Sequence, residues 1–308
     1  MTPLRAVVCA YSPVGREALA GLLEAGVEVA VLYTYAQGPD EKWFEAPAEL
    51  AQRHGIPVRM AANFNADAVY DELRELAPDF LFSFYFREMI QARVLALPRL
   101  GAYNLHGSLL PAYRGRAPIN WVLVKGETRT GVTLHAMTPK PDDGDVIAQV
   151  PLAIDWDETA LSLTLKAAAA GRQLMKEALP ALMRGEAPRL PQKTLGPSSY
   201  FGGRKPDDSR LDFAMTAKEA FNQIRAVADP WPNAYLETSR GKLHVAWALP
   251  TALPCPAGTF KATEEGVLLG FADQALRIVA LRNHSQRSER PTDHAAWLQA
   301  LGIPETKP

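Results

Sequence analysis

The stretch LRAVVCAYSPVGREALAGLLEAGVEVAVLYTY, residues 4–35, carries the pattern that decides the fold class. Residues 4–10 are apolar except for Arg5, which is typical of a strand buried on both faces. A Ser-Pro pair interrupts the run, and residues 16–24 then place apolar side chains at helical spacing. A second apolar run follows at residues 27–35. The order strand, helix, strand predicts two parallel strands joined by a helix.

The same alternation continues to about residue 184. Further strands are predicted at residues 57–60, 80–86, 102–106, 130–137 and 146–154, and helices at 46–54, 67–77, 118–124 and 159–184. Strands that alternate with helices of this length predict a mostly parallel, doubly wound sheet, so the fold class is α/β. Residues 130–137 alternate in polarity, which is typical of a strand with one wetter face.

The composition changes after residue 186. Prolines at positions 188, 191, 197 and 206 and a Gly-Gly pair at 202–203 indicate a linker over residues 187–206. A helix at 216–228, short strand-like runs at 234–236, 243–249, 266–271 and 276–281, and a last helix at 293–301 follow. Short strands joined by tight turns predict a small OB-like barrel. We therefore expect one domain over residues 1–186 and a smaller one over 207–308.

Composition and charge exclude several classes of protein. The chain has 308 residues, with 33 Lys and Arg against 34 Asp and Glu, which is not typical of a nucleic-acid surface. No apolar run reaches the roughly 18 residues of a membrane span, and the N-terminal run is too short for a signal peptide. Two cysteines, Cys9 and Cys255, cannot form a disulfide framework or a zinc site. We expect a cytoplasmic protein without membrane insertion.

Familiar catalytic motifs are absent from the sequence. The first strand-to-helix turn, residues 11–15, contains only Gly15, whereas a dinucleotide fingerprint needs three glycines at G-x-G-x-x-G spacing. The Gly-Lys-Ser/Thr ending of a P-loop, the G-x-S-x-G elbow and the H-E-x-x-H zinc pair do not occur either. These absences argue against a dehydrogenase, a P-loop enzyme, an α/β-hydrolase and a zinc protease.

Two polar residues end the strand predicted at 102–106. Asn104 and His106 are two positions apart, so both side chains lie on one face of that strand. In open α/β sheets, ligands bind outside the carboxyl ends of the strands. A carboxamide can donate to a developing oxyanion, and an imidazole can exchange a proton near neutral pH. The alternative is a turn-capping asparagine beside a hydrogen-bonded core histidine.

A second polar segment, residues 139–145, follows the strand at 130–137 and should lie at the same edge of the sheet. It contains Asp142, whose carboxylate could hold the His106 imidazole and raise the pKa of that histidine. The alternative is a solvated acidic turn, because Asp-Gly is a common turn pair.

Together these segments resemble the folate-dependent formyltransferases. The matching residues are Asn104, the run His106-Gly107-Ser108-Leu109-Leu110-Pro111, Tyr113-Arg114-Gly115, Thr130-Gly131-Val132-Thr133 and Asp142-Asp143-Gly144-Asp145. The resemblance implies a Rossmann-like catalytic domain, a small barrel-like domain, and formyl transfer from 10-formyltetrahydrofolate to an amine without a metal. It also implies Asn104, His106 and Asp142 as the catalytic residues.

The roles expected of these three residues follow from acyl transfer to an amine. Asn104 and His106 would stabilise the tetrahedral oxyanion. His106 would also protonate the departing folate nitrogen. Asp142 would orient His106, favour its charged form and help to accept the proton of the amine.

Further segments resemble the UDP-4-amino-4-deoxy-L-arabinose formyltransferases of the polymyxin-resistance (ArnA) type, which modify lipid A. These are residues 83–87, 115–124, 204–209 and 225–232. The resemblance implies a stand-alone formyltransferase, acting as a monomer or small homo-oligomer, with a UDP-linked amino sugar as substrate. Methionyl-tRNA formyltransferase and enzymes for other nucleotide-linked amino sugars are the alternatives. From residue 201 onward, 13 Lys and Arg against 12 Asp and Glu give a net charge of +1, a poor match to tRNA.

By the same resemblance, the folate contacts one set of residues and the sugar nucleotide another. The folate set is Glu88, Met89, Ile90, Arg116, Thr138, Pro139, Lys140, Pro141 and Asp142; for Met89 and Ile90 the alternative is core packing. Arg114, Arg204 and Lys205 are candidates for the diphosphate, and Tyr11 and Trp43 for stacking on the base or lining the entrance of the site. No role is assigned to His135, although it lies in the strand next to the Asp142 segment.

Overall fold

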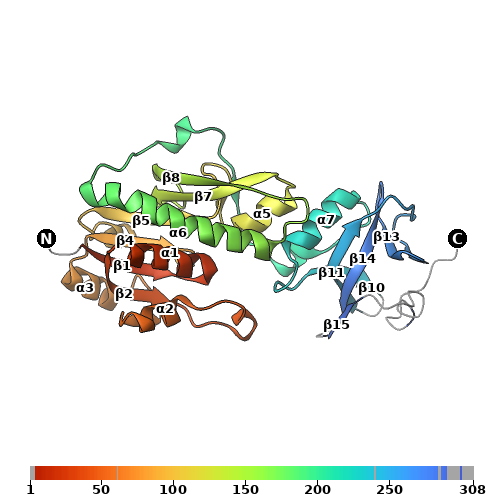
Figure 1. Ribbon diagram of the computed structural model, residues 1–308, viewed down its shortest axis with the longest axis horizontal. Coiled ribbons are helices and arrows are strands. Elements are labelled where there is room, and N and C mark those ends of the chain that lie inside the picture. The colour runs from red at the N-terminus through yellow and green to blue at the C-terminus, as the bar shows by residue number, and fades with distance from the viewer. Residues whose placement is uncertain (1–3, 61, 239–240, 284–285, 290–298, 300–308) are drawn as a thin grey trace. The chain divides into compact units, whose positions relative to one another are not determined.

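The computed structural model describes residues 4–60, 62–238, 241–283, 286–289 and 299 of the chain. The chain divides into two compact units (Figure 1). The first comprises Met1–Pro118, Thr128–Ile154 and Ser162–Gly202, and the second comprises Ile119–Glu127, Asp155–Leu161 and Gly203–Pro308.

The first unit is built on a seven-stranded sheet of order β3-β2-β1-β4-β5-β7-β8. Its strands are β1 (Arg5–Ala10), β2 (Glu28–Thr34), β3 (Val58–Met60), β4 (Phe80–Phe84), β5 (Gly101–His106), β7 (Arg129–Ala136) and β8 (Val146–Ala153). The strands from β3 to β5 are parallel, and β7 and β8 run antiparallel to their neighbours. The predicted α/β class and mostly parallel sheet are confirmed. Because β2 and β4 flank β1 on opposite sides, the topological switch point lies between β1 and β4.

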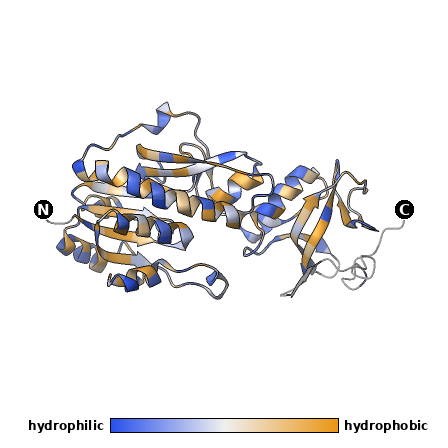
Figure 2. Ribbon diagram, in the orientation of Figure 1, coloured by the Kyte–Doolittle hydropathy of each residue, from blue (hydrophilic) through white to orange (hydrophobic). Residues whose placement is uncertain are grey.

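Helices pack on both faces of this sheet. They are α1 (Ser12–Glu24), α2 (Pro47–Arg53), α3 (Asp67–Leu76), α4 (Ala92–Leu95) and α6 (Ala160–Arg184). On one face, Leu105 of β5 lies so close to α6 that a Cβ on Gly171 would come within 2.8 Å of it. The opposite face packs apolar strand residues against Leu73 of α3 and Val94 of α4. Figure 2 shows apolar and polar residues alternating along α6, as its half-buried position requires.

The second unit contains a six-stranded antiparallel sheet and helix α7 (Ala217–Ala226). Its strands are β10 (Ala234–Thr238), β11 (Gly241–Pro250), β12 (Phe260–Thr263), β13 (Gly266–Gly270), β14 (Ala275–Asn283) and β15 (Gln286–Glu289). Phe221 and Ile224 of α7 belong to one core with Val245 and Ile278 of the sheet. The expected small β domain is thus present, whereas the helix predicted at 293–301 lies, apart from residue 299, outside the described residues. Short helix α5 (Pro118–Val124) spans the boundary of the two units.

Residues 187–202, which the proline content assigned to a linker, belong to the first unit. Leu190 forms a β-bridge with Val146. Strand β9 (Tyr200–Phe201) then pairs in parallel with β6 (Arg114–Gly115), which lies directly after the predicted catalytic strand. Prolines limit backbone hydrogen bonding, but they permit an extended segment that pairs over short stretches. Through this pairing, the segment lies alongside the loop that follows His106. Of the helices in the described ranges, none is long and apolar enough to cross a membrane.

Candidate active site

Asn104 and His106 lie at the carboxyl end of β5, as the strand pattern predicted. Antiparallel pairing with β7 places His135 directly opposite Asn104. Nδ2 of Asn104 lies 3.0 Å from Nε2 of His135. His106 is almost fully buried, and its Nε2 lies 2.8 Å from the carbonyl oxygen of Tyr113. The site therefore begins with two histidines and one carboxamide on adjacent strands.

Asp142 joins these residues from the loop between β7 and β8. Its Oδ1 lies 3.5 Å from Nδ1 of His106 and 3.6 Å from Nε2 of His135. Its Oδ2 accepts a 2.8 Å hydrogen bond from the backbone N–H of Gly115. Because the Asp142 side chain is only 12% exposed, the alternative of a solvated acidic turn is wrong. The structure thus brings together the three residues that the sequence assigned to catalysis.

Two side chains hold the Asp142 loop by its backbone. Nε2 of Gln192 donates 2.8 Å hydrogen bonds to the carbonyl oxygens of Asp142 and Gly144. Arg114 donates to the carbonyl oxygen of Pro141 at 2.9 Å and pairs with Asp143 at 2.8 Å. Asp142 itself has a positive φ of 50°, a conformation that non-glycine residues adopt only when their surroundings impose it.

Replacement of Gly144 by alanine is expected to dislodge this loop. A Cβ at position 144 would lie 1.9 Å from the carbonyl oxygen of Ala136, which belongs to the rigid strand β7. Backbone at that distance must move, so we expect Gly144→Ala to lower turnover at least about tenfold, since small misplacements of catalytic groups are costly. Steady-state kinetics check this, with Gly202→Ala, where an added Cβ meets nothing within 4 Å, as the control for substitution of a glycine. Wild-type turnover in Gly144→Ala would show that the loop position does not matter.

The protonation state of His106 differs from the expectation. A carbonyl oxygen can only accept, so Nε2 of His106 carries the proton that it donates to Tyr113. Burial lowers the pKa of His106, and the opposing effect of Asp142 does not restore it. The predicted effect of Asp142, which raises the pKa of His106, is therefore present, but burial outweighs it and the net shift is downward. His106 is a neutral imidazole at neutral pH, with Nδ1 unprotonated and turned towards Asp142.

Asp142 remains ionised throughout the physiological range. Burial alone would raise its pKa, but His106, His135 and the Gly115 N–H together lower the pKa of Asp142 to about 2. A carboxylate with so low a pKa is a weak proton acceptor, because effective general bases have a pKa near the working pH. Asp142 is better suited to stabilise positive charge beside it than to accept a proton itself.

Acid is expected to destabilise the first unit through Asp142. The folded pKa of about 2 lies below the ordinary value of 3.8, so the ionised carboxylate stabilises the fold above that ordinary value. This contribution, about 2 kcal/mol for a shift of nearly two units, is lost as the pH falls through the folded pKa. Urea unfolding of the wild type and Asp142→Asn checks the prediction. Their difference in stability should narrow between about pH 6 and about pH 2.5; a constant difference would contradict it.

His135 is a site residue to which the sequence analysis gave no role. Its Nδ1 lies 2.8 Å from the carbonyl oxygen of Ala136 and therefore carries a proton. In the neutral ring, Nε2 then accepts one N–H of the Asn104 carboxamide, which fixes the direction of the other. The two-residue alternation of Thr133 and His135 was the signal in the strand itself. It could not show that His135 lies opposite Asn104, because the residues of a strand do not reveal which strand it pairs with.

The loop after His106 is held by the segment that was predicted as a linker. Oγ of Ser199 accepts a 2.8 Å hydrogen bond from the backbone N–H of Tyr113. The ring of Tyr113 stacks on that of Phe201 at 4.9 Å. These contacts fix the Tyr113 carbonyl group that holds His106. Ser199, at this loop, and Gln192, at the Asp142 loop, are therefore supporting residues that the sequence analysis missed.

The predicted folate residues fall into two stretches. In the first, Glu88 accepts a hydrogen bond from the backbone N–H of Phe64 at 3.0 Å, and the carbonyl oxygen of Met89 accepts one from Asn65 at 2.8 Å. Ile90 is buried in the core, as the alternative of core packing proposed, but the Met89 side chain is exposed. The second stretch, 138–142, is the loop that carries Asp142, and within it Thr138 and Lys140 are hydrogen-bonded to each other.

The predicted sugar-nucleotide residues do not form one group. Arg114 lies at the site but is bonded to the Asp142 loop. Arg204 and Lys205 belong to the second unit, where the Arg204 guanidinium lies 4.9 Å from the Trp121 ring centre. Tyr11 is buried at the end of β1, and Trp43 contacts the ring of Phe44. The exposed Arg116 side chain lies in the loop after β5.

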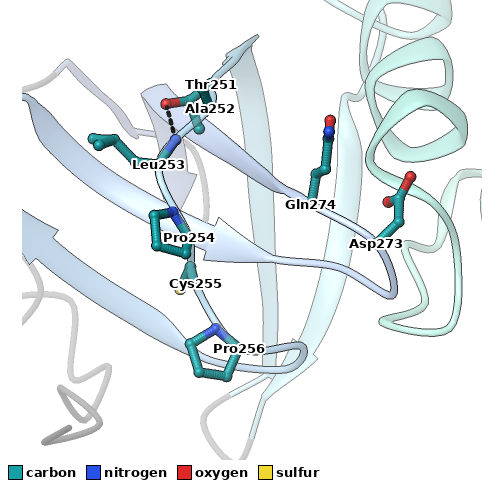
Figure 3. A pocket seen from close by; sticks show the side chains of 8 residues that line it. All are labelled: Thr251, Ala252, Leu253, Pro254, Cys255, Pro256, Asp273 and Gln274. Atoms are coloured by element: carbon teal, nitrogen blue, oxygen red, sulfur yellow. Dashed lines mark hydrogen bonds between the residues drawn. The ribbon is translucent and has the colours of Figure 1, made fainter.

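The second unit contains a pocket of about 400 Å³ (Figure 3). Its lining is Thr251, Ala252, Leu253, Pro254, Cys255, Pro256, Asp273 and Gln274, and none of these was predicted as a site residue. The buried thiol of Cys255 lies 3.2 Å from the Thr259 hydroxyl. Within the described part of the chain, no cluster of histidine, cysteine or acidic residues could hold a metal ion.

Comparison with known proteins gives a consistent result. The formyl transferase family matches residues 15–179, and the formyl transferase C-terminal domain matches residues 204–298. An N-formyltransferase from Helicobacter canadensis, solved with folinic acid and dTDP-3-aminofucose, is similar with a TM-score of 0.71 at 19% identity, covering 94% of this chain and all of that one. WlaRD, a sugar 3N-formyl transferase solved with dTDP and 5-N-formyl-THF, has a TM-score of 0.69 at 18% identity, covering 95% and 100%.

HypX from Aquifex aeolicus, solved with tetrahydrofolic acid, has a TM-score of 0.67 at 19% identity and covers 99% of this chain. The chain spans about half of HypX, 49% of its length. At these identities the solved structures support the fold, whereas the family match extends over more than half of the sequence. The chain therefore belongs to the formyl transferase family.

Proposed function

We propose that this chain transfers a formyl group from 10-formyltetrahydrofolate to the amine of a nucleotide-linked amino sugar. The observation that carries the proposal is the convergence of Asn104, His106 and Asp142 at the carboxyl end of β5 and β7, with His135 between them. Acyl transfer to an amine is aided by a donor to the developing oxyanion and by a group that moves the proton, and a carboxamide and a neutral imidazole beside a fixed carboxylate can supply both.

Asn104 is proposed as the donor to the formyl oxygen. His106 was expected to share this role, but its Nε2–H is bonded to the carbonyl oxygen of Tyr113 instead. One of its N–H groups is directed to Nε2 of His135, and the other remains to meet the negative charge that develops as the amine attacks. A donor fixed before the reaction costs no reorganisation when the charge appears. His135 acts in this proposal as the positioning residue for Asn104.

His106 is proposed as the group that moves the proton. Its unprotonated Nδ1 can accept a proton from the attacking amine, while Nε2 stays bonded to Tyr113. The resulting imidazolium lies 3.5 Å from the Asp142 carboxylate, which stabilises its positive charge. His106 can then return the proton to the nitrogen that leaves. No covalent enzyme intermediate is needed, and Asp142 acts by its charge.

The residues around the site fit a folate formyl donor. The stretch 88–90 and the loop 138–142 offer backbone groups suited to the amide edge of a pterin, and the exposed Met89 side chain offers an apolar surface. The Arg116 guanidinium could meet a carboxylate or a carbonyl group of this donor. When bound, the folate supplies the activated formyl group, and the chain supplies the donors and the proton acceptor.

For the acceptor we propose UDP-4-amino-4-deoxy-L-arabinose. The support is the resemblance of residues 83–87, 115–124, 204–209 and 225–232 to the ArnA-type enzymes of polymyxin resistance, which act in lipid A modification. Another nucleotide-linked amino sugar is the second candidate, because the similar H. canadensis enzyme was solved with dTDP-3-aminofucose. Initiator tRNA is disfavoured by the net charge of +1, from 13 Lys and Arg against 12 Asp and Glu, beyond residue 200.

The test is an incubation of the chain with 10-formyltetrahydrofolate and single acceptors, followed by mass spectrometry. We expect UDP-4-amino-4-deoxy-L-arabinose to gain the mass of one formyl group. Product on dTDP-3-aminofucose alone would change the sugar and keep the reaction. Product on methionyl-tRNA alone would overturn the substrate class, and formate release without any formylated amine would replace the transferase by a hydrolase.

A further inference from the structure

Three donors converge on one carboxylate outside the catalytic group. The Tyr11 hydroxyl and the backbone N–H of Gly38 both donate to Oε2 of Glu41, the latter at 2.8 Å. The Arg87 guanidinium contacts Oε1 of the same residue at 3.0 Å. Glu41 ends the 3₁₀ turn η1 (Pro39–Glu41) in the loop after β2, whereas Tyr11 and Arg87 follow β1 and β4. We call the three donors of Tyr11, Gly38 and Arg87 the Glu41 cradle.

Aromatic rings surround the cation of this cradle. The Arg87 guanidinium lies 4.4 Å from the ring centre of Tyr11 and 5.5 Å from that of Tyr35. Tyr35 in turn stacks on Phe86 at 4.9 Å and accepts a 3.2 Å hydrogen bond from the backbone N–H of Arg87. Contacts of this kind attract the guanidinium to the ring faces independently of its acidic partner.

The cradle lies at the switch point of the sheet, where open α/β folds bind ligands. Tyr11 directly follows β1, and Arg87 follows β4, its neighbour across the switch. The segment that continues from Arg87, residues 88–90, is the one assigned above to the folate. A ligand in the cradle would therefore lie beside the formyl donor and at the same edge of the sheet as β5.

The occupant of the cradle can be exchanged. The Arg87 and Glu41 side chains are 52% and 33% exposed, and ion pairs with such exposure contribute little, between about 0 and 1 kcal/mol. Burial would raise the pKa of Glu41, but the Tyr11 hydroxyl, Gly38 and Arg87 hold it below its usual value. Burial and Glu41 raise the pKa of Tyr11 to about 12, so its hydroxyl is a donor at neutral pH. The cradle is thus an anion site now filled by a residue of the chain.

We propose that the Glu41 cradle binds a phosphoryl group of the nucleotide-linked acceptor, and that Glu41 occupies it until this ligand displaces it. The inference rests on the proposed function for the identity of the acceptor. A phosphoryl group offers the oxygens that the three donors require and carries more charge than the carboxylate it replaces. The rings of Tyr35 and Phe44 beside Tyr11 provide apolar surface for the attached nucleoside. Arg87 replaces Arg114, which is bonded to the Asp142 loop, as the cation for the diphosphate.

Calorimetric titration with UDP and with dTDP tests the proposal. Arg87→Gln should weaken binding of the nucleoside diphosphate about tenfold or more, the scale of one charge-assisted hydrogen bond. Arg59→Gln is the matched control. Arg59 pairs with Glu72, which accepts a hydrogen bond from Tyr33, and these two side chains are 51% and 33% exposed. Loss of affinity in Arg87→Gln with unchanged affinity in Arg59→Gln supports the site.

The variant Glu41→Gln distinguishes two possible roles of Glu41. It either competes with the ligand for the cradle or only holds the Arg87 side chain in place. If Glu41 competes with the ligand, Glu41→Gln should bind the diphosphates as tightly as the wild type or more tightly. If Glu41 only holds Arg87 in place, this variant should weaken binding as Arg87→Gln does, which would overturn the proposal. Equal affinities in Arg87→Gln and the wild type, or no binding of either diphosphate by the wild type at millimolar concentrations, would overturn it as well.

The carboxylates on the glutamate part of the folate are a second kind of anion that could occupy the Glu41 cradle in place of a phosphoryl group. Titration with 5-formyltetrahydrofolate distinguishes them: an effect of Arg87→Gln on this ligand instead of on the diphosphates assigns the cradle to the folate and rejects the proposal. Failure of the proposed function has a different signature. If the proposed function fails, no amino sugar is formylated, although UDP binding still depends on Arg87. If only the cradle proposal fails, the amino sugar is formylated, and Arg87→Gln leaves the KM for this acceptor unchanged.

Discussion

Asn104→Ala is expected to lower kcat by about 10²–10³, the cost of removing one preorganised oxyanion donor in other acyl-transfer enzymes. The carboxamide is held by His135 at 3.0 Å, so its second N–H is fixed before the reaction begins. Affinity for 5-formyltetrahydrofolate should remain within about threefold, because the donor acts on charge that is present only in the transition state. Single-turnover kinetics and calorimetry on the same preparations measure the two quantities.

Ser83→Ala provides the matched control for that experiment. Ser83 is in register with Asn104 on the neighbouring strand β4 and is a buried polar residue, whereas Asn104 is partly exposed. Its truncation should leave kcat within about threefold, since surrounding polar groups contribute little unless they meet developing charge. A kcat for Asn104→Ala that is no lower than that of Ser83→Ala would remove the carboxamide from the mechanism.

Much of the fold could be predicted because its signals are local. The apolar runs of β1, β2 and β4 are continuous, and such strands must be buried on both faces of a parallel sheet. The alternation of residues 130–137 predicted a strand with one wetter face, and this was wrong: residues 130–135 of β7 are all buried, and the polar side chains of Thr133 and His135 are hydrogen-bonded inside the fold. The pairing of residues 200–201 with residues 114–115 could not be predicted, because proline content describes local stiffness, whereas this pairing depends on the rest of the fold.

Only the features of the site that depend on the geometry of a single strand or loop could be predicted. The two-residue spacing of Asn104 and His106 sufficed to place them on one face, and the end of β7 sufficed to bring Asp142 near. The contact of Asn104 with His135 depends on the register between β5 and β7, which no single segment encodes. The direction of the His106 pKa shift was also missed, because burial outweighs the nearby carboxylate and burial is a property of the folded chain.

His106→Gln is expected to have the larger effect, a loss of about 10²–10⁴ in kcat, the range contributed by a general acid–base group. The residue both accepts the proton of the amine and returns it to the leaving nitrogen in our proposal, so no neighbouring group can replace it. His54→Gln is the control, because His54 is an exposed histidine that caps α2. Turnover of His106→Gln equal to that of His54→Gln would reject the role.

The pH dependence of kcat/KM tests the same role independently of any loss in folding. Because burial lowers the pKa of His106 from its ordinary 6.5, the neutral, active form persists below that value, and activity should fall only at lower pH. Asp142 opposes this shift by favouring the imidazolium, so Asp142→Asn should move the acid limb to still lower pH while reducing kcat. His106→Gln should lose the limb altogether. If His106→Gln kept the acid limb of the wild type, the titrating group would be the substrate or another residue, and His106 could not be the proton acceptor.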